Sequence, residues 1–292
     1  MKELVGHGVA LITPFKKNGE VDYTAIPKII DHLINGGVDY LVVLGTTGET
    51  ATLSDNEKKH LISTIVKYNA GRIPLVIGIG GNNTNQVIKN INSIDLSPFV
   101  AILSVTPFYN KPNQEGLYHH FGAIARNSSL PIVLYNVPSR TGVNLLPQTV
   151  FRLANDFSKI VAIKEATGDI KQAQTLLNIC PGDFLILSGD DETSLSMLLA
   201  GAKGVISVIG NAIPEEFSKV VYYGIEGSVK EAYQTQNKIL DLIRSIYDEG
   251  NPTGIKVLMS ALGLCENYLR LPLVPASKDL YDKLNRSFKK FI

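Results

Sequence analysis

The lysine in the run VAIKEATG, residues 161–168, is the residue of this sequence with the clearest potential for chemistry. Lys164 ends an apolar, strand-like run, and side chains along a strand alternate between its two faces. If Ile163 points outward to a helix layer, Lys164 points inward and Glu165 points away from it. Burial disfavours the ammonium form of a lysine, and a neutral amine attacks carbonyl groups. The pattern therefore favours a nucleophile for carbonyl groups, with a solvated strand lysine as the alternative.

Three further groups could assist such a nucleophile. Tyr135 ends the apolar run PIVLYN and could exchange protons beside Lys164, or could simply fill the core. Thr46 and Thr47, in the loop GTTGET, offer hydroxyl and backbone N–H groups to a small carboxylate, or form an ordinary turn. Arg140 follows Tyr135 and could bind a carboxylate through two parallel hydrogen bonds, or could be solvated.

Eight short apolar runs rich in β-branched residues recur along the chain. The runs are GVALIT (8–13), YLVVLG (40–45), LVIGIG (75–80), VAILSV (100–105), PIVLYN (131–136), IVAIKE (160–165), FLILSG (184–189) and GVISVIG (204–210). Segments with helical periodicity lie between them, as in strand–loop–helix units. Eight such units predict a closed (β/α)8 TIM barrel. The alternative, an open doubly wound sheet, lacks support because GIGGNN (78–83) does not have the GxGxxG spacing.

The barrel prediction gathers the polar residues at one place. Active sites of these barrels lie at the carboxyl ends of the strands. The motifs that follow the strands, such as GTTGET, YNVPSRTG and SGDD, should therefore meet at one rim. After about residue 224 the strand pattern stops and helical periodicity continues. We predict a catalytic barrel over 1–224 and a C-terminal helical domain of about three helices over 225–292.

Composition excludes several classes of protein. The chain has 292 residues, a formal net charge of +1 and no run of like charges, which argues against nucleic acid or an anionic membrane as a partner. Its two cysteines, Cys180 and Cys265, are far apart and form no metal or redox motif. No apolar run approaches bilayer length and no secretory leader is recognisable, so we expect a cytoplasmic protein that acts on small molecules.

The sequence also argues against metal and phosphate chemistry. Its five histidines are not spaced to converge on a rim, because four fall in predicted helices and His7 is expected to precede the first strand. Asp190 and Asp191 follow the seventh strand, where a bound phosphate would need donors. VAIK also occurs in the lysine strand of protein kinases, but neither HRD nor DFG is present.

Five motifs together resemble the dihydrodipicolinate synthase family, and the resemblance spans nearly all of the chain. They are GTTGE (45–49), TPFYN (106–110), YNVPSRTG (135–142), IKEATG (163–168) and SGDD (188–191). The resemblance implies a (β/α)8 barrel with a C-terminal helical domain. It also implies condensation of pyruvate with L-aspartate 4-semialdehyde on the diaminopimelate route to lysine, without a metal or organic cofactor.

The resemblance assigns a role to each matching residue. Lys164 would be the Schiff-base lysine and Tyr135 the proton carrier. Thr47 would relay protons between Tyr135 and Tyr109. Family members place the tyrosine that matches Tyr109 in the site of a neighbouring subunit, which implies a homo-oligomer, a tetramer built from dimers. Phe108 stands where many members have tyrosine, which changes contacts at that subunit boundary.

The substrate-binding roles follow in the same way. Thr46 and Thr47 would hold the carboxylate of pyruvate, with the carbonyl of Ile206 nearby. Arg140 would bind the carboxylate of the aldehyde substrate. Two alternatives stay open: a sister pyruvate lyase acting on a sugar acid, which Arg140 disfavours, and a catalytically idle barrel, which would be expected to lack one of the rim residues.

The resemblance also bears on feedback inhibition by lysine. Members that lysine inhibits have histidines at the positions that here hold Asp55 and Lys58, and a carboxylate in place of Gln86. Asn82 matches, but the charge pattern does not. A lysine ligand carries two ammonium groups, so loss of an acidic partner predicts weak or absent inhibition.

Overall fold

The computed structural model describes residues 1–291 and contains a closed barrel of eight parallel strands in chain order. The strands are β1 (Gly6–Ala10), β2 (Tyr40–Val43), β3 (Leu75–Gly78), β4 (Ala101–Val105), β5 (Ile132–Asn136), β6 (Ile160–Glu165), β7 (Leu185–Ser188) and β8 (Gly204–Ser207). Each overlaps one of the eight apolar runs, so the barrel prediction is confirmed. The prediction that His7 precedes the first strand is wrong. Gly6 pairs with Gly204 of β8, so β1 begins at Gly6 and includes His7.

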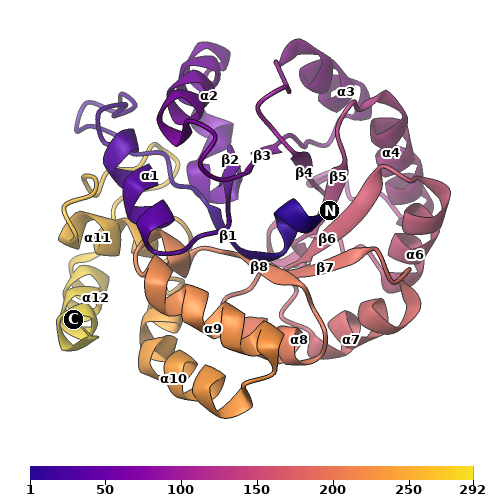
Figure 1. The fold of residues 1–292 in the computed structure, drawn as a ribbon. Helices are drawn as coiled ribbons and strands as arrows, with labels where there is room; N and C mark the ends of the chain where they lie inside the picture. Colours follow the sequence, from indigo (N-terminus) through magenta and orange to yellow (C-terminus); the bar gives the residue numbers. More distant parts are fainter. Residues whose placement is uncertain (292) are drawn as a thin grey trace.

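Helices surround the barrel on all sides (Figure 1). They are α1 (Ile26–Asn35), α2 (Asp55–Asn69), α3 (Thr84–Ser93), α4 (Gln114–Asn127), the short α5 (Pro138–Thr141), α6 (Pro147–Asp156), α7 (Ile170–Ile179), α8 (Ser194–Leu199) and α9 (Pro214–Glu226). Polar side chains cap several of them. Ser54 forms a capping box with Glu57 at α2, and Asn113 accepts a hydrogen bond from the Gly116 N–H at α4. Each such cap contributes about 1 kcal/mol.

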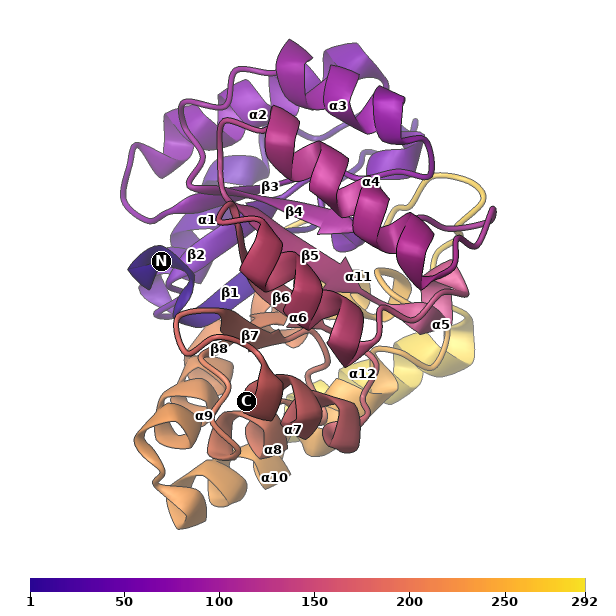
Figure 2. The same cartoon turned by 90° about the vertical axis from the view of Figure 1, so that its right-hand side faces the viewer.

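Three α-helices follow α9 within residues 1–291: α10 (Val229–Ser245), α11 (Thr253–Ala261) and α12 (Lys278–Phe291). This agrees with the predicted helical extension of about three helices. The first packs against α8 and α9, while α12 packs against both α10 and α11. Figure 2 shows α5 and α11 on the side toward which the arrowheads of β4 and β5 point. The C-terminal helices therefore lie near the strand ends where a barrel active site forms.

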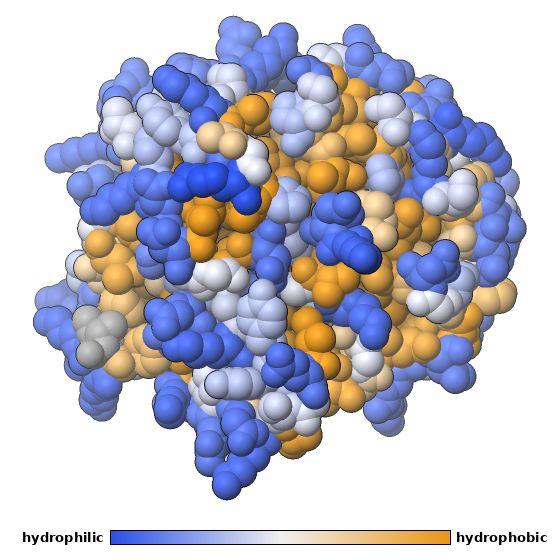
Figure 3. Space-filling view, viewed as in Figure 1, coloured by the Kyte–Doolittle hydropathy of each residue, from blue (hydrophilic) through white to orange (hydrophobic). Residues whose placement is uncertain are grey.

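Two apolar layers make the core. The outer layer fills the space between strands and helices, and the inner layer fills the barrel. Leu4, in the short 3-10 helix η1 (Lys2–Leu4), is fully buried and belongs to the inner layer. Figure 1 accordingly shows the N-terminus at the centre of the ring of strands, and Figure 3 shows a mixed surface of hydrophilic and apolar patches from the same side. The chain thus closes the N-terminal end of the barrel with its own first turn.

A bulge between β5 and β6 determines which side chains share the barrel interior. Ile132 pairs with Ile160, but the next pair is Val133 with Ala162, so Val161 is an extra residue. A shift of one residue moves every following side chain to the other face of a strand. Because of this bulge, Lys164 rather than Ile163 lies opposite Tyr135.

No helix among residues 1–291 combines the length and the apolar character needed to cross a membrane.

Candidate active site

Lys164 and Tyr135 lie side by side inside the barrel. Their backbones pair directly across β5 and β6. Lys164 is 4% exposed, and its Nζ lies 4.4 Å from the centroid of the Tyr135 ring. Ile163 belongs to the outer apolar layer, whereas Tyr135 and Ile206 belong to the inner one. The predicted inward direction of Lys164 is therefore confirmed, and burial removes the water that would otherwise solvate its amine.

Gly189 makes room for the lysine side chain. A Cβ atom at this position would lie 2.7 Å from Cε of Lys164 and 2.7 Å from Cβ of Ala166. Real Cβ atoms do not approach other atoms this closely, so any side chain here would displace Lys164. The glycine of the SGDD motif is therefore required by the packing of the candidate nucleophile.

Glu165 points away from Lys164, as the alternation of the strand predicts. Its carboxylate is 1% exposed and accepts hydrogen bonds from the Asn136 and Gln172 side chains, at 3.0 and 2.9 Å, and from the Thr167 N–H at 2.8 Å. This network ties the end of β6 to the end of β5. Glu165 therefore supports the strand ends that carry the lysine and the tyrosine, and it is not a direct partner of the amine.

The loop after β2 holds Thr46 and Thr47 in a short 3-10 helix, η2 (Thr46–Gly48). Thr47 is 2% exposed, while Thr46 is exposed. Residues in a left-handed conformation flank this turn, Leu44 with a φ of 58° and Glu49 with a φ of 51°. A bulky residue such as Leu rarely adopts this backbone, which costs on the order of 1–3 kcal/mol and concentrates at functional sites.

A buried ion pair holds this loop against the C-terminal helices. The Glu49 carboxylate lies 2.5 Å from Nζ of Lys256 on α11, and both side chains are almost fully buried. Glu49 also accepts the Arg270 backbone N–H at 3.1 Å. Nζ of Lys256 lies 4.3 Å from the Phe15 ring centroid and donates to the Tyr268 carbonyl at 2.9 Å. The position of the threonines thus depends on residues more than 200 positions later in the chain.

Arg140, on the short helix α5, is exposed at the mouth of the barrel. One guanidinium nitrogen, Nη2, donates to the backbone carbonyl of Asn251 at 3.2 Å. Among residues 1–291 it forms no salt bridge, so the rest of its guanidinium is available to an anion. The Asn251 side chain also donates to Oγ1 of Thr47, at 3.0 Å. Asn251 was not predicted from the sequence and connects two of the predicted site residues.

Tyr109 is the most exposed of the predicted catalytic residues. It is 89% exposed and has a φ of 70°. Two hydrogen bonds hold its loop in place: Asn82 Nδ2 donates to the Phe108 carbonyl at 3.1 Å, and Asn110 Nδ2 donates to the Asn82 carbonyl at 2.9 Å. A large aromatic side chain thus projects outward from a fixed loop.

The Asp191 carboxylate accepts hydrogen bonds from backbone N–H groups that follow β8. A phosphate bound at this place would need the same donors. The carboxylate is 1% exposed and accepts the N–H groups of Val208 and Ile209, at 3.0 and 2.8 Å. Burial raises the pKa of Asp191 to about 7, although these bonds and the charge of Lys164 favour the ionised form. The expected absence of a phosphate site agrees with this arrangement. Tyr247, which was not predicted, donates to the same carboxylate at 3.4 Å.

Burial raises the pKa of Tyr247 well above its usual value, and the fields of Asp191, Asp190 and Tyr135 act in the same direction while Arg140 opposes them. Tyr247 therefore lies within electrostatic range of the tyrosine and the arginine of the site. Like Asn251, it comes from the segment between α10 and α11. Nothing in the spacing of the sequence indicates that this segment reaches the barrel mouth.

The histidines pack elsewhere. His7 is buried in β1 and hydrogen-bonds the hydroxyls of Ser207 and Ser218, both at 2.8 Å. Burial lowers the pKa of His7 to about 3, so it is neutral at ordinary pH. The other four lie on α1, α2 and α4, as predicted. Across residues 1–291, no group of three or more histidine, cysteine, aspartate or glutamate side chains is arranged to hold a metal ion.

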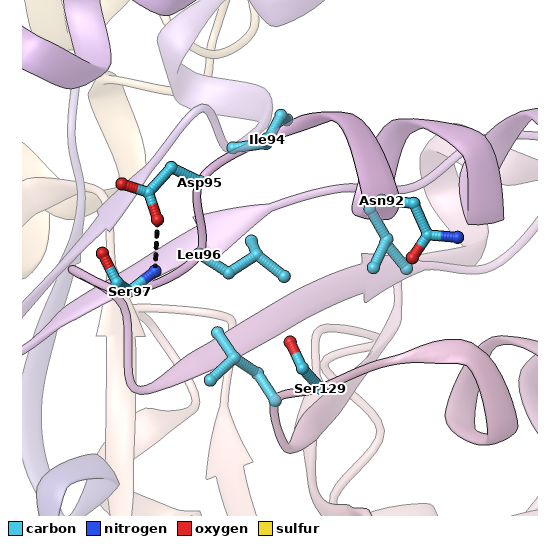
Figure 4. Close-up of a pocket in the computed structure, with 8 residues that line it drawn as sticks. Asn92, Ile94, Asp95, Leu96, Ser97 and Ser129 are labelled. Carbon is cyan, nitrogen blue, oxygen red and sulfur yellow. Dashed lines mark hydrogen bonds between the residues drawn. The ribbon is translucent and has the colours of Figure 1, made fainter.

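A pocket of about 410 Å³ lies at the opposite end of the barrel (Figure 4). It is lined by the last turn of α3 and by residues that follow α3 and α4, among them Asp95, Leu96 and Ser129. Its only charged group, Asp95, accepts the Ser97 N–H at 3.0 Å. This pocket contains no nucleophile or base paired for catalysis, and residues at the N-terminal face of such barrels serve stability. The Lys164 end of the barrel is therefore the candidate active site.

Comparisons with known proteins agree with this geometry. A model of the dihydrodipicolinate synthetase family matches residues 3–291. The 4-hydroxy-tetrahydrodipicolinate synthase of Flavobacterium psychrophilum is 53% identical over 285 residues, which cover 98% of this chain and 97% of the relative.

Two solved structures superpose closely on the whole chain. One is the chloride-inhibited dihydrodipicolinate synthase from Acinetobacter baumannii complexed with pyruvate, with a TM-score of 0.96, 39% identity and coverage of 99% of both chains. The other is a monomeric dihydrodipicolinate synthase variant, with a TM-score of 0.96, 38% identity and coverage of 99% of this chain and 97% of that one.

Proposed function

The chain belongs to the dihydrodipicolinate synthetase family and condenses pyruvate with L-aspartate 4-semialdehyde, and we propose that Lys164 forms the Schiff base that carries this reaction. The observation that supports Lys164 is its burial on the inner face of the barrel, with Nζ 4.4 Å from the centroid of the Tyr135 ring. An amine enclosed in this way can attack the ketone of pyruvate without competition from bulk water.

The steps follow from the chemistry of an amine and a ketone. Nζ of Lys164 adds to the carbonyl carbon, and loss of water gives an iminium ion. The positive nitrogen draws electrons from the methyl carbon, which loses a proton and becomes an enamine. The enamine carbon bonds to the aldehyde carbon of the second substrate, whose oxygen takes up a proton and becomes a hydroxyl group, and the iminium on Lys164 forms again. The amino group of that substrate then displaces Lys164 by transimination, which closes the ring and frees the enzyme.

Tyr135 carries protons in these steps, and Thr47 relays them toward Tyr109 of a second copy of the chain. Thr46 and Thr47 bind the carboxylate of pyruvate, with the Ile206 carbonyl beside it. Support comes from the burial of Thr47 and from Ile206 and Tyr135 belonging to one inner cluster. Backbone N–H groups in a tight turn are suited to bind a small carboxylate.

Borohydride reduction in the presence of pyruvate tests the role of Lys164. Reduction converts the iminium into a stable amine, so we expect one pyruvate-derived adduct on the peptide that contains Lys164, together with loss of activity. Lys256 is a matched internal control, because it is equally buried but ion-paired with Glu49. An adduct on Lys256, or on no lysine, would contradict the mechanism. Lys164→Ala should fold and form no adduct.

Arg140 selects the second substrate by binding its carboxylate. Support comes from its exposed guanidinium, which has no carboxylate partner among residues 1–291. Arg140→Ala should retain pyruvate trapping on Lys164 and lose most of its kcat/KM for the semialdehyde, because a charge-assisted hydrogen bond contributes about 1.5–3 kcal/mol. Arg126→Ala, at an exposed site on α4, is the control and should behave like the unmodified enzyme. Equal effects of both substitutions on substrate use would refute this role.

The active enzyme is a homo-oligomer, at least a dimer and in full a tetramer built from dimers. Support comes from Tyr109, which is 89% exposed on a loop that two asparagines hold in place. Tyr109→Phe and Lys164→Ala should each be inactive alone. Mixed subunits should regain activity, because a Tyr109→Phe subunit supplies Lys164 and its Lys164→Ala neighbour supplies Tyr109. Failure of mixed oligomers to regain activity would show that Tyr109 does not act across subunits.

We also propose a division of the chain near residue 224, with the catalytic barrel before it and a helical domain after it. Support comes from Gly227, which ends α9 with a φ of 76° and separates the last barrel helix from α10. The biosynthetic activity of the relatives is consistent with a cytoplasmic enzyme.

A further inference from the structure

Asn82 connects the loop that carries Tyr109 to the neighbouring loop of the barrel. It lies between β3 and α3, and its Nδ2 donates to the Phe108 carbonyl at 3.1 Å. Its own backbone carbonyl accepts Nδ2 of Asn110 at 2.9 Å. Among the described residues, the segment 107–112 makes no other hydrogen bond to a different part of the chain. Asn82 is therefore the polar anchor of this loop.

The anchored loop contains a strained turn centred on Tyr109. The Asn110 N–H donates to the Phe108 carbonyl at 2.8 Å, which closes a three-residue turn, and Tyr109 has a φ of 70°. A γ-turn with a positive φ at its centre is rare and strained. A tyrosine keeps such a backbone only where the surrounding contacts hold it. The Asn82 amide binds the same carbonyl that closes the turn, so it holds the strained conformation directly.

The two loops approach each other because Gly80 has no side chain. β3 and β4 are paired strands, so the loops that follow them are neighbours at the mouth of the barrel. A Cβ atom at Gly80 would lie 2.8 Å from Cγ1 and 2.9 Å from the backbone N of Val105, the last residue of β4. The glycine therefore lets the loop after β3 pack against the end of β4, where Asn82 bonds to Phe108.

We propose that Asn82 is a positioning residue for the reaction, which acts by holding Tyr109 in the conformation that serves the site of a second copy of the chain. This inference rests on the proposed function, in which Tyr109 acts across subunits. The Tyr109 side chain is 89% exposed, so packing within its own chain does little to fix the direction of the ring. The backbone of the turn sets that direction instead, and Asn82 anchors the turn.

The kinetics of Asn82→Ala provide the first test. The variant loses the bond to the Phe108 carbonyl but keeps the backbone contact with Asn110. Its kcat should fall about tenfold, which corresponds to about 1.4 kcal/mol and is the size of one neutral hydrogen bond. The final extent of borohydride trapping should not change, because the adduct needs only Lys164 of the same chain. An unchanged kcat, or a loss of trapping as large as the loss of kcat, would overturn the proposal.

Mixed oligomers separate positioning from a general loss of stability. Tyr109→Phe chains and Lys164→Ala chains are co-expressed with different affinity tags, so that purification retains only mixed oligomers. The active site then takes Lys164 from the first chain and Tyr109 from the second. Asn82→Ala in the second chain should lower the regained activity about tenfold. In the first chain, whose loop carries phenylalanine, it should leave that activity unchanged. Equal losses from either chain would overturn the proposal, because Asn82 would then act through the stability of the whole assembly.

Asn83→Ala is the matched control in the same loop. Asn83 caps α3, where its Oδ1 accepts the Gln86 N–H at 3.2 Å, and among the described residues it makes no hydrogen bond to the segment 107–112. Loss of a cap lowers stability, yet kcat should equal that of the unmodified enzyme. A loss of kcat equal to that of Asn82→Ala would remove the basis of the proposal, because truncation of either asparagine would then have the same effect.

Asn82→Asp provides a second variant, with a side chain of the same shape. An ionised carboxylate cannot donate to the Phe108 carbonyl, so kcat should be no higher than in Asn82→Ala, and a kcat equal to that of the unmodified enzyme would contradict the role of the amide. The mixed oligomers without any change at Asn82 separate this inference from the proposed function. If they regain no activity, the role of Tyr109 across subunits fails and this inference fails with it. Regained activity that Asn82→Ala lowers equally from either chain refutes only the role of Asn82.

Discussion

Replacement of Lys256 by methionine should be among the most destabilising single changes in the C-terminal region. The substitution keeps the length of the side chain but leaves the buried Glu49 carboxylate without its cation. It also removes the donor to the Tyr268 carbonyl. Breaking a buried ion pair by removal of one partner costs about 3–5 kcal/mol. At ~2–4 °C per kcal/mol for a chain of this size, Tm should fall by roughly 6–20 °C.

Thermal unfolding at a fixed protein concentration provides the measurement, with two reference variants. Lys283→Met removes a surface ion pair, in which Nζ lies 2.7 Å from Asp248 and both side chains are about half exposed, so it should cost less than about 1 kcal/mol. The double variant Lys256→Met with Glu49→Gln should recover most of the lost stability, because the unpaired charge is gone. A Tm of Lys256→Met close to that of Lys283→Met, or a double variant no more stable than the single one, would refute the reasoning.

Three further predictions follow from the site. The pKa of Asp191 is raised to about 7 in the fold, so the folded state binds an extra proton between its usual value of 3.8 and about 7, and the stability that Asp191 contributes should fall as pH rises through this window. Urea unfolding of the unmodified enzyme and of Asp191→Asn should therefore give a stability difference that declines over this window, and a difference that grows would contradict the assignment. Gly189→Ala should fold but lose most pyruvate trapping, because the new Cβ displaces Lys164; full trapping would show that the lysine can move aside. Lysine should inhibit weakly or not at all, because the neutral Gln86 and the cationic Lys58 replace the charge pattern of inhibited members, and sub-millimolar half-inhibition in a titration at fixed pyruvate would contradict this.

The sequence alone was sufficient to predict the barrel and the direction of its key side chain. Eight apolar runs at the spacing of strand–loop–helix units have few other ways to bury their surface. Alternation along β6 correctly assigned Lys164 to the inner face and Glu165 to the opposite one. The start of β1 was the least predictable boundary, since pairing of Gly6 with Gly204 includes His7 in the strand.

Only the tertiary structure decided which distant residues complete the site. The bulge at Val161 sets Lys164 opposite Tyr135, and the lysine depends on the missing side chain of Gly189 for space. Asn251 contacts Thr47 across 204 positions of sequence. Periodicity records which face of an element is apolar, because burial of that face is a local property of the pattern. It does not record which loops meet, because that depends on the register of the strands and on how the C-terminal helices pack over the barrel.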